Sequence, residues 1–342
     1  MSHPSQAARR TRRLSGIAAG LAAALVAATA TACGSTAGLG SPDEPNLRVG
    51  IVDSIGVIPF EYGMSAAHNA FGNAGLSVTV QRFASQPEEI AALSSGRIDI
   101  AYGEYSQFLS KVSDIAVNGK IRVISEAYDA APNTVALMVR KGAKEPVATN
   151  LAQACNSLSI VVTNKYSPEF LALSNWFQAQ GTPINFLGCA SVKEISNPQD
   201  AIAAVVSNKD SAIVLQEPYI TSAEINSGLR VAEDLAAGNA SAMPLDGYFA
   251  TSDFTRRYPR TTAIFASVMA KLQTSAAERV IIENALNGQS GTDQLVTSTM
   301  QIGTFPSGVL AARLDIVLRL MNSAGSINGM LSSATLTNLG AG

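Results

Sequence analysis

Short apolar runs alternate with longer amphipathic stretches along the chain after residue 46. Leu47–Val52 is apolar and β-branched, and Leu76–Phe83 alternates apolar and polar residues with a period of two, so both predict strands. Ser85–Ser95 predicts a helix, because acidic residues fill its first turn, apolar residues share one face and a glycine follows it. Ile98–Tyr102 and Ile121–Ser125 are further strand candidates. This alternation predicts an α/β fold, with a mostly parallel sheet flanked by helices.

The length of the alternating region indicates two lobes rather than one. Its nearly 300 residues exceed what a single ordinary core holds. An extended run at Asn133–Gly142 would carry the chain into the second lobe, and a strand after Asp246 would return it. We expect a signal segment at 1–32, a flexible tether at 33–46, lobe 1 at 47–136, lobe 2 at 137–246, the return of lobe 1 at 247–325 and a polar, frayed tail at 326–342.

One phrase occurs twice, once in each predicted lobe. Ile90–Tyr105 and Ile202–Tyr219 both have a helix, a polar turn, an apolar strand, and then a Glu and a Tyr beyond the strand. The repeat places Glu104 and Glu217 at the carboxyl ends of strands, where ligands of open α/β sheets bind. Convergence is the alternative, because many helix–strand units share this pattern.

The first 33 residues have the features of an export signal. Four arginines (Arg9, Arg10, Arg12 and Arg13) precede an uncharged stretch of Ala, Leu and Val, which ends in Ala30-Thr31-Ala32-Cys33. The stretch is too short and too weakly apolar for a spanning helix. A Cys after small residues resembles the lipobox of bacterial lipoproteins and implies that Cys33 becomes the lipidated first residue. Ordinary cleavage nearby is the alternative, and the paired arginines leave twin-arginine export open.

Export would place the remaining cysteines in an oxidising compartment. Cys155 and Cys189 each lie three residues before a predicted strand, at Leu158–Thr163 and Val192–Ile195. If those strands are parallel neighbours, the two sulfurs can form a disulfide; two buried free thiols are the alternative. We expect no metal site, since the chain after the signal holds a single histidine, His68.

Charge argues against a nucleic-acid partner. The chain has 24 basic and 26 acidic residues, and no acidic residue precedes Asp43, so the exported part is more acidic than the net charge of −2 indicates. Such a surface does not attract phosphate backbones. Apart from the lipid anchor on Cys33, we therefore expect neither a membrane-binding surface nor a nucleic-acid interface.

Motifs for common enzyme chemistry are missing from the sequence. It contains no Walker loop, no G-x-G-x-x-G, no H-E-x-x-H and no G-x-S-x-G, and we expect His68 to lie on a helix surface or in a cap. Glu104 and Glu217 could act as an acid and a base across a cleft, or could be solvated or cap a helix. We expect no cofactor and no catalysis.

Polar and aromatic residues follow the predicted strands in both lobes and form the candidate ligand-binding site. Ser167 also predicts a helix N-cap with Pro168 at the first helical position, an end that can bind an anionic group. The candidate residues are Ser54, Val57, Tyr102, Glu104, Tyr128, Asn164, Ser167, Glu217 and Tyr219.

From Leu47 to about Phe305 the chain resembles the substrate-binding proteins of bacterial ABC importers, in the group that serves alkanesulfonates, taurine, nitrate and thiamine-precursor pyrimidines. The resemblance lies in LRVGIVDSIGVIPF, GLSVTVQRF, IAALSSGRIDIAYG and AIVLQEPY. It implies a two-lobed, type 2 periplasmic-binding-protein fold, expected to be a monomer, whose cleft closes on a small molecule and docks on a permease with its ATPase. Ser54, Val57, Tyr102, Glu104, Ser167 and Glu217-Pro218 match the site positions of that group.

The ligand stays open at this level. Glu104, Tyr102, Tyr105 and Glu217 suit an amine or a nitrogen ring, while the helix start at Ser167 suits an anionic end. An amino sulfonate, an amino-acid-like zwitterion or a substituted pyrimidine would satisfy these groups. An enzyme relative that makes the thiamine pyrimidine uses clustered Cys and His, which this chain lacks. An exported sensor and an enzyme using the Glu pair are the competing functions.

Overall fold

The computed structural model describes residues 39–143, 159–180, 192–287, 293–327 and 331–339. The predicted signal segment with Cys33, and both Cys155 and Cys189, lie outside these residues. Within the described ranges, no helix has the length and apolar character needed to cross a membrane.

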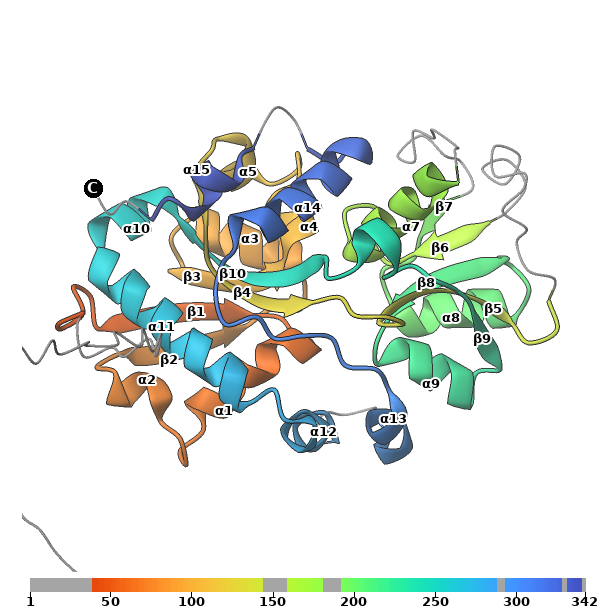
Figure 1. Cartoon of the computed structure of the whole chain (residues 1–342), viewed down its shortest axis with the longest axis horizontal. Coiled ribbons are helices and arrows are strands. Elements are labelled where there is room, and N and C mark those ends of the chain that lie inside the picture. Colours follow the sequence, from red (N-terminus) through yellow and green to blue (C-terminus); the bar gives the residue numbers. More distant parts are fainter. Residues whose placement is uncertain (1–38, 144–158, 181–191, 288–292, 328–330, 340–342) are drawn as a thin grey trace, which may run out of the picture. The chain divides into compact units, whose positions relative to one another are not determined.

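Two five-stranded sheets organise the described chain (Figure 1). Sheet A has the order β2-β1-β3-β10-β4, and sheet B the order β7-β6-β8-β5-β9. The strands of sheet A are β1 (Asn46–Ile51), β2 (Ser77–Arg82), β3 (Ile100–Glu104), β4 (Ile121–Asp129) and β10 (Pro244–Thr251). The strands of sheet B are β5 (Val135–Arg140), β6 (Ile160–Val162), β7 (Val192–Glu194), β8 (Ala212–Gln216) and β9 (Leu229–Asp234).

Each sheet contains one reversed strand, which refines the prediction of mostly parallel sheets. In sheet A, β1 pairs in parallel with β2 and β3, whereas β10 runs antiparallel to both of its neighbours. In sheet B, β6 pairs in parallel with β7 and β8, and β5 is the antiparallel strand. The reversed strand in each case is the one that enters directly from the other sheet. Such a strand needs no helical crossover, so it can insert in the opposite direction.

Helices cover both faces of both sheets, as the alternation predicts. Around sheet A lie α1 (Ile58–Met64), α2 (Ala70–Asn73), α3 (Gln86–Ser94), α4 (Tyr105–Phe108), α5 (Asp114–Val117), α10 (Ser252–Arg257), α11 (Pro259–Ser275), α14 (Ala311–Ser323) and α15 (Ser333–Thr337). Sheet B is covered by α7 (Pro168–Ala179) on one face and by α8 (Pro198–Val206) and α9 (Tyr219–Asn226) on the other. Two short 3-10 turns lie at Ile55–Val57 and Gly238–Ala240.

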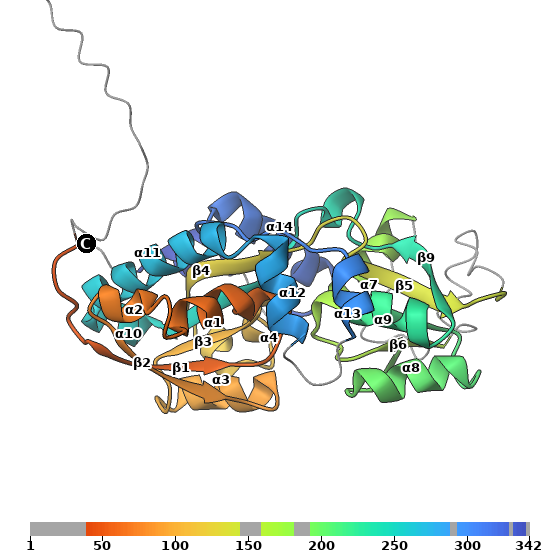
Figure 2. The same ribbon diagram turned by 90° about the horizontal axis from the view of Figure 1, so that it is seen from below.

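The return segment contacts both sheets and is not confined to the first. After α11, which packs on α1 and β4, the chain forms α12 (Arg279–Asn287) and α13 (Gln294–Thr299). Figure 2 shows α13 beside α9, which it contacts. Helix α14 then contacts α7 of sheet B as well as α4 and β10 of sheet A.

Three segments connect the two sheets. The first, 130–134, joins β4 to β5, and the second, 235–243, joins β9 to β10; Ala130 N donates to Met243 O at 2.9 Å, so they run side by side. The third is the stretch after α13, where Asp129 and Thr304 exchange two backbone hydrogen bonds. These backbone bonds bundle the connections into one narrow strip.

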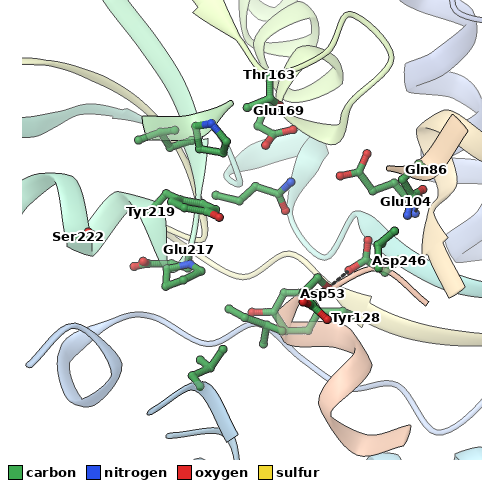
Figure 3. Close-up of a pocket in the computed structure, with 18 of the residues that line it drawn as sticks. Asp53, Gln86, Glu104, Tyr128, Thr163, Glu169, Glu217, Tyr219, Ser222 and Asp246 are labelled. Carbon is green, nitrogen blue, oxygen red and sulfur yellow. Dashed lines mark hydrogen bonds between the residues drawn. The ribbon is translucent and has the colours of Figure 1, made fainter. Parts of the chain in front are cut away.

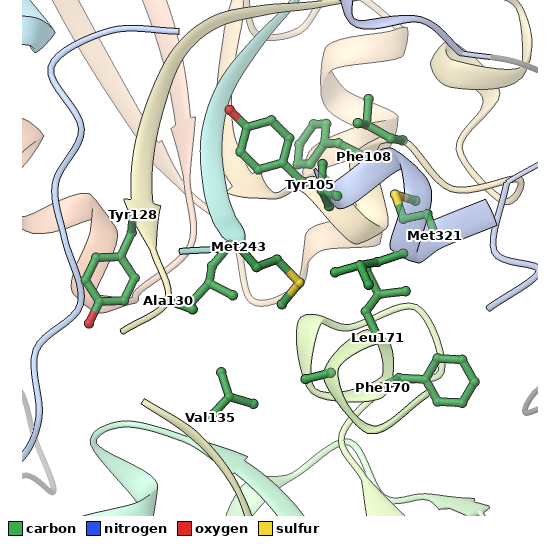
Figure 4. Close-up of a cluster of buried hydrophobic side chains, with 14 of the residues drawn as sticks. Tyr105, Phe108, Tyr128, Ala130, Val135, Phe170, Leu171, Met243 and Met321 are labelled. Carbon is green, nitrogen blue, oxygen red and sulfur yellow. The ribbon is translucent and has the colours of Figure 1, made fainter. Parts of the chain in front are cut away.

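An apolar cluster continues from one sheet to the other beside this strip (Figure 4). Tyr105 and Met321 contribute from the side of sheet A, Phe170 and Leu171 from α7, and Met243 from the second connection. On each sheet, a separate apolar cluster covers the face opposite to this shared one. The two lobes therefore have their own sheets but share part of one core.

Both ends of the described chain are held against sheet A more firmly than the sequence indicates. Near the predicted tether's end, Asp43 pairs with Arg260, and Glu44 exchanges hydrogen bonds with Thr261 at the start of α11. Near the other end, Leu336 of α15 is 1% exposed and packs toward α14 and β4. The polar composition of 326–342 predicts a frayed tail, whereas the structure has a short helix here that docks through the buried side chain of Leu336.

Candidate functional site

A pocket of about 900 Å³ lies between the two sheets (Figure 3). Sheet A contributes the loop after β1, the ends of β3 and β4 and the start of β10. The other wall comes from the end of β8 and the first residues of α7, α8 and α9, while α12 and α13 supply a few apolar atoms. Its size falls within the range for small-molecule sites.

Asp246 is a buried carboxylate of this pocket that two hydroxyl groups hold in place. It is 7% exposed, and its Oδ2 accepts hydrogen bonds from Tyr102 Oη at 2.7 Å and from Ser54 Oγ at 3.3 Å. Burial raises the pKa of Asp246 to about 6, although the hydrogen bonds from Tyr102 and Ser54 oppose that shift. The carboxylate is therefore oriented by its neighbours but carries a charge that burial disfavours.

The reversed direction of β10 places Asp246 directly opposite Glu104. The register pairs these two residues across β3 and β10, and pairs Asp246 with Tyr128 of β4 on the other side. Like charges opposite one another in an antiparallel pair are destabilising. Burial, then Glu169 and Asp246, raise the pKa of Glu104 well above its usual range, while a hydrogen bond from Gln107 lowers it.

The loop after β1 approaches this pair closely because residue 56 is a glycine. A Cβ at Gly56 would lie 2.5 Å from Tyr102 Oη and 2.9 Å from Asp246 Oδ2. The Ser54 side chain accepts a hydrogen bond from Gly56 N at 3.1 Å and caps the short 3-10 turn that follows. Any larger residue at 56 would separate Ser54 from the carboxylate that it contacts.

Glu169 brings a further carboxylate from the opposite wall. It lies in the first turn of α7, where the helix dipole favours an acid, and is 6% exposed. Its Oε2 has no hydrogen-bond partner in the described chain. Figure 3 shows this carboxylate directed into the pocket. Glu169, Glu104 and Asp246 therefore concentrate negative charge from both walls in one space.

One cationic side chain lines the pocket among the described residues, and it is already paired. The Arg82 guanidinium contacts the carboxylates of Asp53 and Glu61, which also line the pocket. Two acids on one guanidinium leave no net positive charge there. The described residues also contain no group of His, Cys, Asp and Glu arranged to hold a metal ion.

Glu217 serves the structure of the pocket wall. Its carboxylate accepts hydrogen bonds from Thr221 N at 3.1 Å, Thr221 Oγ1 at 2.8 Å and Gln301 N at 3.1 Å. Burial raises the pKa of Glu217, and these donors limit the shift. Because its oxygens are used to cap α9 and to hold the third connection, Glu217 is a positioning residue in this structure.

Comparison with known proteins identifies the fold. No family model matches the chain, and no curated protein matches its sequence. The alkanesulfonate-binding protein SsuA from Xanthomonas axonopodis pv. citri bound to MOPS is 12% identical, with a TM-score of 0.66 over 86% of this chain and 98% of that one. A zinc-bound ligand-binding component of an ABC-type import system from Staphylococcus aureus is 12% identical, with a TM-score of 0.65 over 87% and 98%.

The periplasmic nitrate-binding protein NrtA from Synechocystis PCC 6803 is 14% identical, with a TM-score of 0.59 over 79% of this chain and 74% of that one. The fold is that of the periplasmic binding proteins. This confirms the two-lobed fold class, while the identities are too low to carry a ligand across.

In this periplasmic-binding-protein fold, the pocket brings together six of the nine predicted site residues. They are Ser54, Tyr102, Glu104, Tyr128, Glu217 and Tyr219. The other three are placed elsewhere: Val57 is fully buried in the core of sheet A, Ser167 caps α7 by accepting from Phe170 N, and Asn164 lines a separate cavity of about 170 Å³. Tyr105 is also buried, packed on Phe249 at 5.2 Å between ring centroids.

Sequence reasoning missed Asp246, Glu169 and Gln86, which all line the pocket. Asp246 lies near the start of β10, and because this strand is reversed, its first residues lie at the edge where the other strands of sheet A have their carboxyl ends. Glu169 carried a visible signal, since it follows the predicted Ser167 cap and Pro168. An acid in the first turn of a helix that faces a cleft occupies the place expected for an anionic ligand.

Proposed function

We propose that this chain is an extracytoplasmic solute-binding protein that captures a small organic molecule between its two sheets and delivers it to an ABC importer. The observation that carries the proposal is the pocket itself: strand ends and helix starts from both sheets line it, and three connections lie together beside it. A ligand that contacts both walls would favour the closed arrangement through its differential affinity. The import components among the similar structures support the same function.

Native mass spectrometry of gently purified protein tests the capture step. We expect one small molecule per chain, lost on denaturation. NMR of the released compound before and after renewed incubation tests for turnover, and we expect no change because the pocket lacks an identified catalytic constellation among its described residues. Loss of uptake of that compound on deletion of the chain would support import, whereas unchanged uptake would favour sensing. Protein free of any small molecule, together with no stabilisation by any compound offered, would contradict the proposal.

We further propose that Cys33 is lipidated and anchors the chain outside the cytoplasmic membrane. The support is the sequence Ala30-Thr31-Ala32-Cys33 after a cationic, apolar leader. Metabolic labelling with radioactive palmitate is expected to mark the wild-type chain and not a Cys33→Ala variant. Equal labelling of both would contradict the assignment.

A disulfide between Cys155 and Cys189 is a separate proposal. Strands β6 and β7 are parallel neighbours, with Ile160 opposite Val192, which supports the arrangement on which the pairing depends. We expect no free thiol from this pair when the denatured, unreduced protein is titrated, and two after reduction. Such a link typically stabilises by about 2–4 kcal/mol. Two titratable thiols before reduction would refute the pairing.

A further inference from the structure

The chemistry of the pocket lining narrows the solute's class. Four carboxylates in the lining, those of Glu104, Glu169, Glu217 and Asp246, have no ion-pair partner in the described chain. The one guanidinium among the described lining residues, that of Arg82, is shared between two other acids. An anion such as a sulfonate would enter a space of the same charge, without a free cation to bind it.

Helix N-termini, the other source of anion binding, are occupied by the chain's own side chains. At α7, the Ser167 hydroxyl accepts from Phe170 N at 3.3 Å, and the Glu169 carboxylate lies in the first turn. At α8, the Asn197 side chain accepts from Gln199 N at 2.9 Å and from Asp200 N at 3.1 Å. These caps satisfy backbone donors that would otherwise face a bound anion.

Two buried polar atoms of the described lining residues have no hydrogen-bond partner: the Glu169 Oε2 acceptor and the Gln86 Nε2 donor. The acceptor belongs to a carboxylate, so it calls for a donor that is also cationic. Glu169 Oε2 is buried and accepts no hydrogen bond from the described chain. Its neighbours Glu104 and Asp246 are acids as well, so they add negative charge around it. A buried carboxylate without a partner is costly, and a protonated amine would supply both the missing donors and the opposite charge. Tyr128 and Tyr219 add aromatic surface to the same lining, which suits the organic part of a cation.

We propose, on the basis of the solute-binding function above, that the captured molecule carries a protonated amine or quaternary ammonium group, which lies between Glu104 and Asp246 on one wall and Glu169 on the other. The ligand's charge joins acids from both walls, so the cation that is bound also holds the two sheets together. A molecule bearing only an anionic group is excluded from this pocket by the same charges.

Thermal-shift and calorimetric screening of two probe sets tests the proposal on the purified protein. The first set contains choline, 1,4-diaminobutane, benzylamine and their homologues; the second contains ethanesulfonate, nitrate and uracil with their homologues. We expect stabilisation by members of the first set only. Binding of anions or neutral compounds in the absence of any ammonium binder would overturn the inference and leave the capture function intact. Binding by neither set would overturn both.

Isosteric variants then test the assigned carboxylates with the best ammonium probe. Glu169→Gln is expected to weaken its binding at least about tenfold, because it removes one charge while Ser167 still caps α7. Asp246→Asn is the second variant, with a loss of similar size. The charge-matched control is Glu278→Gln, at an exposed position outside the pocket lining, which should bind as the wild type does. Unchanged affinity in both pocket variants, with wild-type melting temperatures, would refute the site.

Discussion

Arg313→Met is expected to lower the free energy of unfolding by about 3–5 kcal/mol at pH 8, the loss typical of a broken buried ion pair. Arg313 Nε lies 2.6 Å from Glu126 Oε2 and 3.7 Å from Asp129 Oδ2. The side chains of Glu126 and Asp129 are 0% and 2% exposed, so without the guanidinium two charges would stay buried beside each other.

The loss should shrink at low pH. Burial, and then the charge of Glu126, raise the pKa of Asp129 to about 7, although Arg313 opposes the shift. Between its unfolded value near 4 and this folded value, the folded chain binds more protons than the unfolded chain, so Asp129 destabilises the fold increasingly as the pH rises through that window. Removing Arg313 raises the folded pKa further and so extends this window to higher pH.

Urea unfolding at pH 5 and pH 8 measures both effects. The control is Arg256→Met, since Arg256 pairs with Asp253 on the surface and such pairs contribute about 1 kcal/mol or less. An Arg313→Met loss below 1 kcal/mol at pH 8, or a loss that grows toward pH 5, would show that Arg313 does not compensate these carboxylates. The location matters for function, because Asp129 adjoins the first connection and pairs with Thr304 of the third.

The affinity for an ammonium ligand is expected to fall at least about tenfold between pH 8 and pH 5. A cation favours the ionised carboxylates, and the pKa of Asp246 in the ligand-free pocket is raised to about 6, chiefly by burial. Below that pH, each carboxyl that must lose its proton weakens binding by about tenfold per pH unit. Tyr102 and Glu104 face Asp246 from β3, Tyr128 from β4 and Glu169 from α7.

Calorimetry in two buffers of different ionisation enthalpy is the appropriate measurement, because binding should also release protons near pH 6. Asp246→Asn should flatten the pH dependence of the affinity by the part that Asp246 contributes. The matched Asp253→Asn, in the first turn of α10 beyond the far end of β10, should leave that dependence unchanged. Equal affinities at pH 8 and pH 5 would mean that the ligand's charge does not act on these carboxylates.

Local sequence signals located most secondary structure because they reflect short-range physics. The apolar run at Leu47–Val52 became β1, and Ser167 with Pro168 began α7 as predicted. The repeated phrase placed Glu104 and Glu217 at strand ends, and both line the pocket. It could not assign their roles, since one of the three donors that occupy Glu217 is Gln301 N, 84 residues further along the chain.

The sequence by itself determined the alternation of strands and helices, the two sheets and the presence of acids and tyrosines at one edge of each, because periodicity and capping depend on neighbouring residues. Only the tertiary structure decided which of them share a space. Strand β10 enters sheet A in reverse, which places Asp246 between Glu104 and Tyr128, and the packing of α7 turns Glu169 toward them. The resulting concentration of negative charge arises from pairings between distant segments, such as Tyr102 and Asp246, which are 144 residues apart, and no local pattern encodes it.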